Sequence, residues 1–263
     1  EILEKGPSGR LHVKNKGDVG KKKVPIKQGT VESDLVYLLV RGREISKWSF
    51  KPNLYVVIPH LSNTGWRAIP EETMMTEYPE AYKFLHQFKE MLNKRSGKKQ
   101  LRKNHPMYIL GSIGKHTFEP FKVAWGSISK QVKAAVLEPL DDPYLGRKIP
   151  MLEHSAMYLE TASWEEAHFV CALLNSTPSQ VTINCFKGMG AYGNISRLIS
   201  IPRFNVEDST HLLLSDLSRE AHRRTRAGKS VASIEAAIDK YAIEVWDLDE
   251  PEMEGILGEL NEF

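Results

Sequence analysis

Residues 163–175 read SWEEAHFVCALLN, and this segment decides the fold because it predicts a helix that packs into the core. Ser163 stands three residues before Glu166, which is the spacing of a capping box at a helix N-terminus. The apolar residues that follow fall on one helical face: Trp164, Ala167, Cys171 and Leu174. We therefore expect a helix that begins after Ser163 and buries that face.

Strand-like runs, rich in β-branched and aromatic residues, occur on both sides of this helix. They cover residues 35–40, 54–58, 121–125, 134–137, 156–160, 181–186 and 197–201. Further helices are predicted from Pro79 to Arg95 and in two C-terminal stripes, which contain Leu213, Leu214, Leu217 and Ala221, and then Val231, Ile234, Ile238, Tyr241 and Val245. This order of elements predicts an α+β fold, with a mixed β-sheet body, a few packed helices and a C-terminal helical segment.

The pattern divides the chain into three regions. Residues 1–30 are rich in lysine and weakly patterned, which indicates a basic lead-in or linker from a preceding domain. Residues 31–205 hold the mixed body, and residues 206–263 hold the helical segment. No run approaches the roughly 18 apolar residues of a membrane-spanning helix, and no secretory pattern opens the chain. We therefore expect a cytoplasmic protein without a membrane partner.

Charge is distributed unevenly along the chain. The formal net charge is +3, but residues 244–263 contain eight acidic residues and no lysine or arginine. The rest of the chain holds 36 basic and 25 acidic residues, an excess of 11 positive charges. This excess favours a polyanionic partner, because lysine and arginine neutralise the phosphates of nucleic acids. An ordinary solvated surface is the alternative interpretation.

Motifs that would indicate catalysis fail in their context. Residues 188–193 (GMGAYG) match the dinucleotide-binding pattern, but that pattern needs a following helix, and residues 195–201 predict a strand. Residues 228–230 (GKS) end like a phosphate-binding loop but follow a helix. The nine histidines and two cysteines lack zinc-ligand spacing, and no Pro-Pro pair is present for an adenine-methylating loop. We predict no catalytic residue, metal site or cofactor in this chain.

Several blocks, in order, resemble the TaqI-like C-terminal specificity domain of type II N6-adenine DNA methyltransferases and restriction-modification enzymes. The first block is LVRGREI at residues 39–45, followed by Trp48. Later blocks are YPEAY (78–82), FKVAW (121–125), ALLNS (172–176), ISIPRF (199–204), IDK (238–240) and VWDL (245–248). The resemblance covers residues 35–260. It departs after Trp125, where many relatives have Arg-Glu-Ile-Ser and this chain has Gly126-Ser127-Ile128-Ser129.

The resemblance implies that residues 31–205 form a target-recognition domain and that the catalytic methyltransferase domain lies outside this chain. The catalytic domain is expected to bind S-adenosylmethionine and to flip the target adenine. This chain is expected to read double-stranded DNA and to have no activity alone. The contact that an arginine after the tryptophan would make is in doubt here, because Gly126 occupies that position.

The predicted DNA-binding residues come from the matched blocks and from the glycine-rich loop: Arg41, Arg43, Lys47, Lys122, Ser127, Lys187, Tyr192, Asn194 and Arg197. Arginine can pair bidentately with guanine edges, while lysine holds phosphates. An equal alternative is that Arg41 or Arg43 forms an ion pair with Glu44 or another acid and braces the strand end. The basic run of Lys98, Lys99, Arg102 and Lys103 predicts a solvated loop, with phosphate binding as its alternative. Trp125 is predicted to lie in the core.

The sequence leaves a second class of function open. In that alternative, the acidic tail and the C-terminal helices form a protein-protein docking module of a multi-subunit modification complex. The salt dependence of DNA binding distinguishes the two functions. A third possibility, an autonomous enzyme, needs an active site that no motif indicates.

Overall fold

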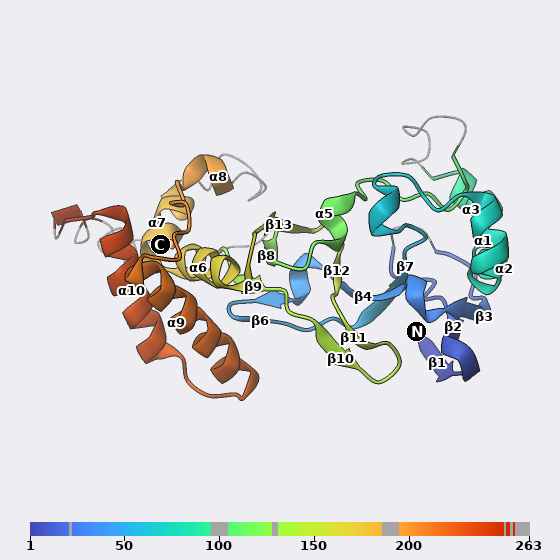
Figure 1. Cartoon of the computed structure of the whole chain (residues 1–263), viewed down its shortest axis with the longest axis horizontal. Helices are drawn as coiled ribbons and strands as arrows, with labels where there is room; N and C mark the ends of the chain where they lie inside the picture. The colour runs from blue at the N-terminus through green and yellow to red at the C-terminus, as the bar shows by residue number, and fades with distance from the viewer. Residues whose placement is uncertain are drawn as a thin grey trace. The chain divides into compact units, whose positions relative to one another are not determined.

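The computed structural model describes residues 1–20, 23–95, 105–127, 131–185, 195–249, 251–252 and 255, and the side chains at 184–185 and 196–197 fall outside the description. The chain folds into two compact units, each assembled from three chain segments (Figure 1). The N-terminal unit contains residues 1–39, 53–119 and 139–151. The C-terminal unit contains residues 40–52, 120–138 and the chain from Leu152 onward. Small antiparallel sheets and helices occur together, which confirms the α+β class.

The N-terminal unit combines antiparallel strands with short helices. Its strands are β1 (Ile2–Lys5), β2 (Arg10–Lys14), β3 (Gln28–Glu32), β4 (Val36–Val40, whose last residue belongs to the other unit), β7 (Leu54–Val57), β10 (Leu140–Asp142) and β11 (Gly146–Lys148). Its helices are α1 (Glu71–Glu77), α2 (Pro79–His86), α3 (Lys89–Asn93) and α5 (Lys115–Phe118), with 3-10 turns η1 (Pro7–Gly9), η2 (Ser33–Leu35) and η4 (Ser62–Thr64). Strands β1, β2 and β3 form one sheet, β4 pairs with β7, and β10 pairs with β11.

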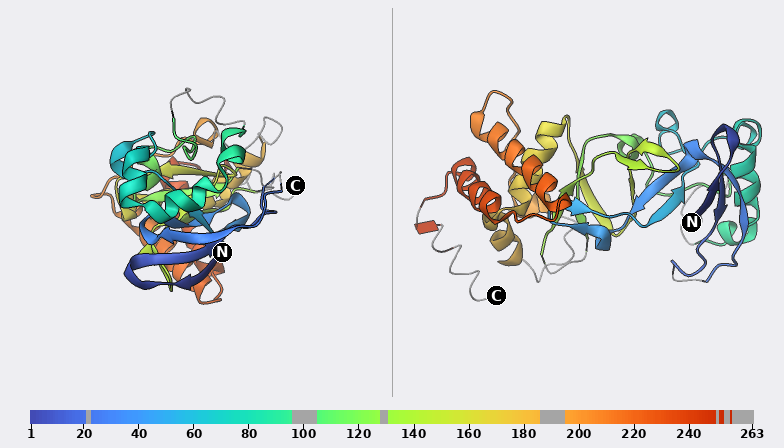
Figure 2. Two further views of the ribbon diagram at one scale, coloured as in Figure 1. Left: turned by 90° about the vertical axis from the view of Figure 1, so that its right-hand side faces the viewer. Right: turned by 90° about the horizontal axis from the view of Figure 1, so that it is seen from below.

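The first strands replace the linker that we expected over residues 1–30. Leu11 and Val31 are opposite each other in the sheet and fully buried. Helix α2 packs on β3, and Figure 2 shows these elements side by side. A Cβ at Gly29 would lie 2.7 Å from the Phe84 ring, so the glycine permits this close approach. The sequence pattern was weak because the few core residues alternate with lysines and other polar residues that face solvent.

The C-terminal unit is built around a three-stranded sheet, a two-stranded sheet and a set of helices. Its strands are β5 (Ile45–Ser46), β6 (Ser49–Phe50), β8 (Lys122–Gly126), β9 (Ala134–Val136) and β13 (Ala156–Glu160), and the turn η3 (Gly42–Glu44) precedes β5. Its helices are α6 (Trp164–Asn175), α7 (Thr177–Cys185), α8 (Ile195–Leu198), α9 (Ser209–Arg226) and α10 (Ala232–Trp246). Strand β8 pairs antiparallel with β13 on one side and β9 on the other. The short β12 (Met151–Leu152) lies on the boundary between the units.

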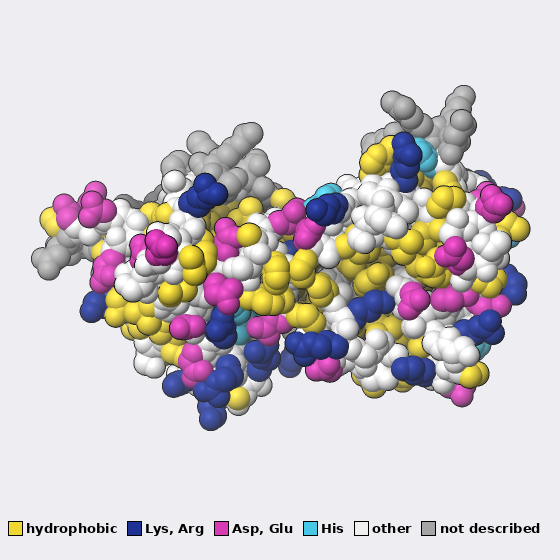
Figure 3. Space-filling view, viewed as in Figure 1, with side chains coloured by type: hydrophobic (Ala, Val, Ile, Leu, Met, Phe, Trp, Pro, Cys, Tyr) yellow, Lys and Arg dark blue, Asp and Glu magenta, His cyan; other side chains and the backbone are white. Residues whose placement is uncertain are grey.

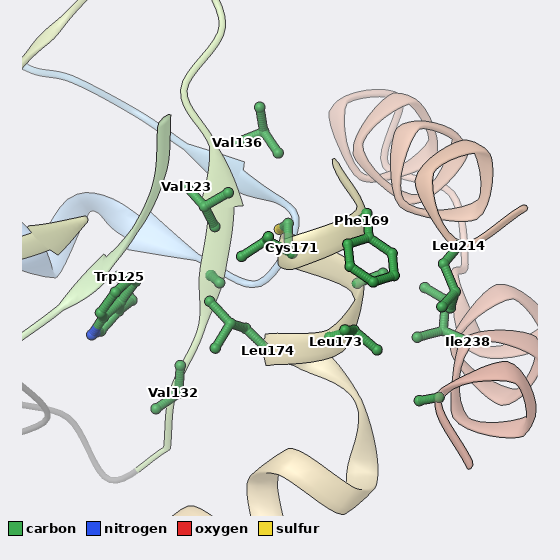
Figure 4. Close-up of a cluster of buried hydrophobic side chains, with 14 of the residues drawn as sticks. Val123, Trp125, Val132, Val136, Phe169, Cys171, Leu173, Leu174, Leu214 and Ile238 are labelled. Carbon is green, nitrogen blue, oxygen red and sulfur yellow. The ribbon is translucent and has the colours of Figure 1, made fainter. Parts of the chain in front are cut away.

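Helix α6 begins as predicted but is more deeply buried than expected. The Ser163 hydroxyl oxygen accepts a hydrogen bond from the Glu166 N–H at 3.1 Å, which caps the helix. Every residue from Ala167 to Asn175 is buried. Figure 4 shows why: Phe169 and Leu173 face α9 and α10, while Leu174 faces the strands. We expected α6 to bury one face only. It is buried on both sides because it lies between a sheet and two helices.

The strands predicted at 181–186 and 197–201 are wrong, because α7 covers residues 181–185, α8 covers residues 197–198, and residues 199–201 form no strand. The β-branched residues of α7 favour a strand locally, but Asp239 of α10 caps the start of the helix. Its carboxylate accepts hydrogen bonds from the Thr177 N–H and the Thr177 hydroxyl, both at 2.7 Å. Val181 and Ile183 are then buried as helix residues. Tertiary packing therefore overrides the local preference.

Two helix predictions also need correction. The helix predicted from Pro79 to Arg95 is divided at Gln87 and Phe88 into α2 and α3. The C-terminal stripes are confirmed as α9 and α10, and Ile234 and Ile238 are buried there. Leu213, however, is 37% exposed and does not belong to the packed stripe.

Candidate nucleic-acid interface

The motif Arg41-Gly42-Arg43-Glu44 forms a compact turn, η3, at the end of β4. The Glu44 carboxylate accepts a hydrogen bond from the Arg41 backbone N–H at 2.9 Å and another from Arg41 Nε at 2.8 Å. Arg41 Nη2 contacts the same carboxylate, and both side chains are largely buried. Of the two alternatives for Arg41, the ion pair that braces the strand end is therefore present.

Gly42 brings this turn against the end of β8. Its N–H donates to the Ser155 hydroxyl oxygen at 3.0 Å. A Cβ at Gly42 would lie 2.2 Å from the Ser155 carbonyl oxygen and 3.1 Å from Gly126 Cα, so no other residue fits without a backbone shift. The Ser127 N–H donates to that Ser155 carbonyl at 2.8 Å. We call Gly42, Gly126, Ser127 and Ser155 the glycine junction.

The chain around Ser155 holds the glycine junction in place. The Ser155 hydroxyl donates to Glu153 Oε2 at 2.5 Å, and the Ser155 N–H donates to the same oxygen at 3.1 Å. The Glu153 N–H donates to the Val40 carbonyl at 2.9 Å. Segments that are more than 80 residues apart in the sequence are thus joined by one backbone hydrogen bond and by the Gly42–Ser155 bond, which give the surface above them a defined geometry.

Two cationic side chains beside the glycine junction are available for a partner. Arg43 is exposed and forms no ion pair with the residues that the structure describes. Lys51 is also exposed and has no ion-pair partner in the described part of the chain. The Lys51 N–H donates to the Glu44 carbonyl at 3.0 Å, which places Lys51 next to the turn. Sequence reasoning missed Lys51, because only the β5–β6 hairpin returns the chain to Glu44.

Lys47 belongs to a contact within the C-terminal unit instead. Its ammonium lies 2.8 Å from Glu235 Oε1, and Trp48 Nε1 donates to the same oxygen at 2.7 Å. Burial opposes ionisation of Glu235, but these two hydrogen bonds lower its pKa. Trp48 is 1% exposed although its φ is +63°, a left-handed conformation that non-glycine residues rarely adopt. Lys47 therefore helps to hold a buried hairpin turn.

Lys122, another predicted residue, is not exposed at the glycine junction. Lys122 is buried in β8 with 2% exposure, and its ammonium lies 5.8 Å from the centre of the Tyr158 ring. Trp125 is buried, as predicted. Lys187, Tyr192 and Asn194 lie outside the described residues, as does the basic run of Lys98, Lys99, Arg102 and Lys103, and of Arg197 only the backbone in α8 is described.

A second group of cations lies at the end of α9, where sequence reasoning considered only helix packing. Arg223 and Arg224 share the Glu220 carboxylate, with nitrogen-to-oxygen distances of 2.6 Å and 2.9 Å. Arg226 pairs with Glu138, and Lys229 is exposed beyond the helix. Figure 3 shows basic side chains gathered over this end of α9. Because the acids are fewer than the cations, this end retains positive charge.

A Ser–His–acid arrangement exists in the C-terminal unit but lies in its core. His168 Nδ1 is 3.1 Å from the Ser218 hydroxyl, and His168 Nε2 is 3.5 Å from Glu138 Oε1. Ser218 is 0% exposed and His168 is 2% exposed, so a substrate has no access to the hydroxyl. These residues join α6, α9 and the end of β9 as a structural network.

The dinucleotide-like residues 188–193 also need a new interpretation. They lie outside the described residues, and a helix follows them where we predicted a strand. The required context is a strand before the glycines and a long helix after them. Here α7 precedes them and the four-residue α8 follows, so the context still differs from that of a dinucleotide site.

Within the described residues, no group of three or more His, Cys, Asp or Glu side chains could hold a metal ion. In the same part of the chain, no helix has both the length and the apolar character needed to cross a membrane. No protein-family model matches this sequence, and the comparison with curated proteins found no significant similarity.

Proposed function

We propose that this chain recognises double-stranded DNA for an N6-adenine DNA methyltransferase of the restriction-modification type. The observation that carries the proposal is the glycine junction with Arg43 and Lys51 exposed beside it. A turn that presents Arg43, with the exposed Lys51 next to it, is suited to phosphates and base edges, because arginine offers a planar fork of donors and lysine a point charge. In this proposal the chain works in the cytoplasm on duplex DNA.

In this proposal, another domain catalyses the methyl transfer. The chain holds the duplex in register, and a catalytic methyltransferase domain binds S-adenosylmethionine and modifies the flipped adenine. The positive charge of residues 1–243 supports a polyanionic partner, as does the TaqI-like order of the sequence blocks. The residues of the glycine junction have a positioning role, since they orient the turn and contact no reacting atom.

The test measures binding of the full chain to a mixed-sequence DNA duplex while salt rises from about 50 to about 200 mM. We expect affinity to fall steeply with salt, and the slope of log K against log salt to become shallower by roughly 1 for each phosphate contact removed. Arg43→Ala and Lys51→Ala should each weaken binding and reduce this slope. Lys240→Ala, which removes an exposed charge from α10, is the matched control and should leave the slope unchanged.

Two results would overturn the proposal. Binding that does not depend on salt would exclude phosphate contacts and favour the protein-docking alternative. Equal losses in Arg43→Ala, Lys51→Ala and Lys240→Ala would show that only net charge matters and that the glycine junction is not the interface.

A further inference from the structure

Trp66 is a large aromatic side chain that the N-terminal unit leaves exposed. Its side chain is 50% exposed, whereas Trp48 and Trp125 are buried. A partner that covered this ring would gain about 2 kcal/mol or more from the apolar area removed from water. The contacts around Trp66 indicate which partner fits.

The segment that carries Trp66 is anchored on both sides. Before it, the Thr64 hydroxyl accepts from the Leu61 N–H at 3.1 Å and donates to the Leu61 carbonyl at 2.8 Å. After it, Ile69 is fully buried and its N–H donates to the Pro59 carbonyl at 2.9 Å. Gly65 has a φ of +60°, a conformation that suits glycine and turns the chain so that Trp66 faces outward. The ring is therefore presented by a rigid loop.

Cationic and aromatic groups surround the exposed ring. The Arg67 guanidinium carbon lies 5.6 Å from the centre of the Trp66 ring. The His105 ring lies 5.2 Å away and almost perpendicular, at 79°. Helix α5, which carries Lys115, packs against η4 just before the tryptophan. Lys115 lies 3.6 Å from Glu119 across one helical turn, so Arg67 is the cation that contacts the ring.

We propose that Trp66, with Arg67 and His105, is a stacking platform for an unpaired nucleobase. Proteins that bind single-stranded nucleic acids combine an aromatic ring, on which a base stacks, with cations that hold the neighbouring phosphates. The Arg67 guanidinium beside the exposed ring supports a polyanion over an apolar protein surface. This inference rests on the proposed function, because its ligand is also a nucleic acid. It assigns a separate contact, made with an unstacked base instead of a duplex.

The test compares a short single-stranded oligodeoxynucleotide of mixed sequence with its fully paired duplex at one salt concentration. Trp66→Ala should weaken binding of the single strand by roughly 5- to 150-fold, the effect of losing one stacked base, and change duplex binding much less. Trp66→Phe, which keeps an aromatic face, should retain most of the affinity. Met75→Ala is the control, because it removes another exposed apolar side chain of the same unit, 55% exposed.

Tryptophan fluorescence provides a second measurement on the same samples. The single strand should quench the emission of the unmodified chain and leave that of Trp66→Phe unchanged, because the other four tryptophans are buried or partly buried. The proposal is overturned if Trp66→Ala binds the single strand within twofold of the unmodified chain, or if Met75→Ala loses as much.

The two proposals can be refuted independently of each other. If Arg43→Ala and Lys51→Ala weaken duplex binding while Trp66→Ala has no effect on the single strand, only the stacking platform is wrong. If Trp66→Ala weakens the single strand while Arg43→Ala and Lys51→Ala leave the duplex unchanged, the platform stands and the proposed duplex interface is wrong.

Discussion

Gly42 illustrates how one residue determines the geometry of the candidate interface. The space that a Cβ would need is occupied by backbone atoms of Ser155 and Gly126, which cannot rotate away as a flexible side chain could. The Gly42 N–H is also used, since it donates to the Ser155 hydroxyl. Any side chain at this position must therefore move the turn that carries Arg43.

We expect Gly42→Ala to lower the free energy of unfolding by about 1–3 kcal/mol, because the added methyl group overpacks a backbone contact. The same substitution should weaken DNA binding by displacing Arg43. Urea unfolding and the salt-dependent binding assay check both effects. Gly111→Ala is the control, since a Cβ there meets nothing within 4 Å, and its stability should change by no more than about 1 kcal/mol. Wild-type stability in Gly42→Ala would contradict the close packing.

At the scale of elements, buried histidines join the helices of the C-terminal unit to its sheet. His222 of α9 accepts a hydrogen bond from the Val136 N–H through Nε2 at 3.0 Å. Its Nδ1 lies 2.7 Å from the Ser218 carbonyl oxygen, so Nδ1 carries the proton and the ring is neutral. Burial, together with the neighbouring His168, lowers the pKa of His222 to about 3. A charged ring would lose the bond to β9.

We expect the stability of the C-terminal unit to fall as the pH decreases from 6.5 towards 3. In the unfolded chain His222 has its ordinary pKa of 6.5, so below that pH the unfolded state binds a proton that the folded state does not. The stabilising contribution is fully present above pH 6.5, and about 3 kcal/mol of it is lost by pH 4. Urea unfolding across this pH range measures the loss.

The variant His222→Gln tests the assignment, because a glutamine carbonyl can accept from Val136 without titrating. Its stability should depend less on pH between 6.5 and 4 than that of the unmodified chain. His60→Gln is the corresponding variant in the N-terminal unit. Burial also lowers the pKa of His60, to about 4, so this variant should alter the pH dependence of the other unit. An unchanged pH profile in His222→Gln would refute the role of His222.

At the scale of the whole molecule, each unit has its own hydrophobic core among the residues that the structure describes. One contains Leu11, Ile69 and Met74, all fully buried in the N-terminal unit. The other surrounds Phe169 and Leu173 of α6 in the C-terminal unit. Each unit draws on three chain segments, so neither can be excised as one continuous piece. Units with their own cores are expected to respond separately to core substitutions.

Thermal unfolding followed by calorimetry should therefore contain two transitions. Met74→Ala should lower the midpoint of one transition and Phe169→Ala that of the other, each through a loss of about 2–5 kcal/mol from a cavity in the core. Leu213→Ala, at a 37% exposed position of α9, is the control and should shift neither midpoint appreciably. One cooperative transition that both core variants lower equally would contradict two independent cores.

The sequence by itself determined the elements whose signals are local. The capping box at Ser163, the strands β4, β7, β8 and β13, and the stripes of α9 and α10 were predicted because hydrophobic period and capping depend on nearby residues. The α+β class follows from their order. The positive charge of residues 1–243 and the RGRE motif at residues 41–44 indicated a nucleic-acid partner.

Only the tertiary structure decided what distant residues do together. The β-branched segment at 177–185 is a helix because Asp239 caps it, and Arg41 is paired while Arg43 is exposed because Glu44 folds back within the turn. The contact between Gly42 and Gly126 arises from packing across a long sequence separation, and the return of Lys51 to Glu44 and the exposure of Trp66 depend on how the hairpin and the loop fold. No local pattern encodes such contacts, because they depend on the complete fold.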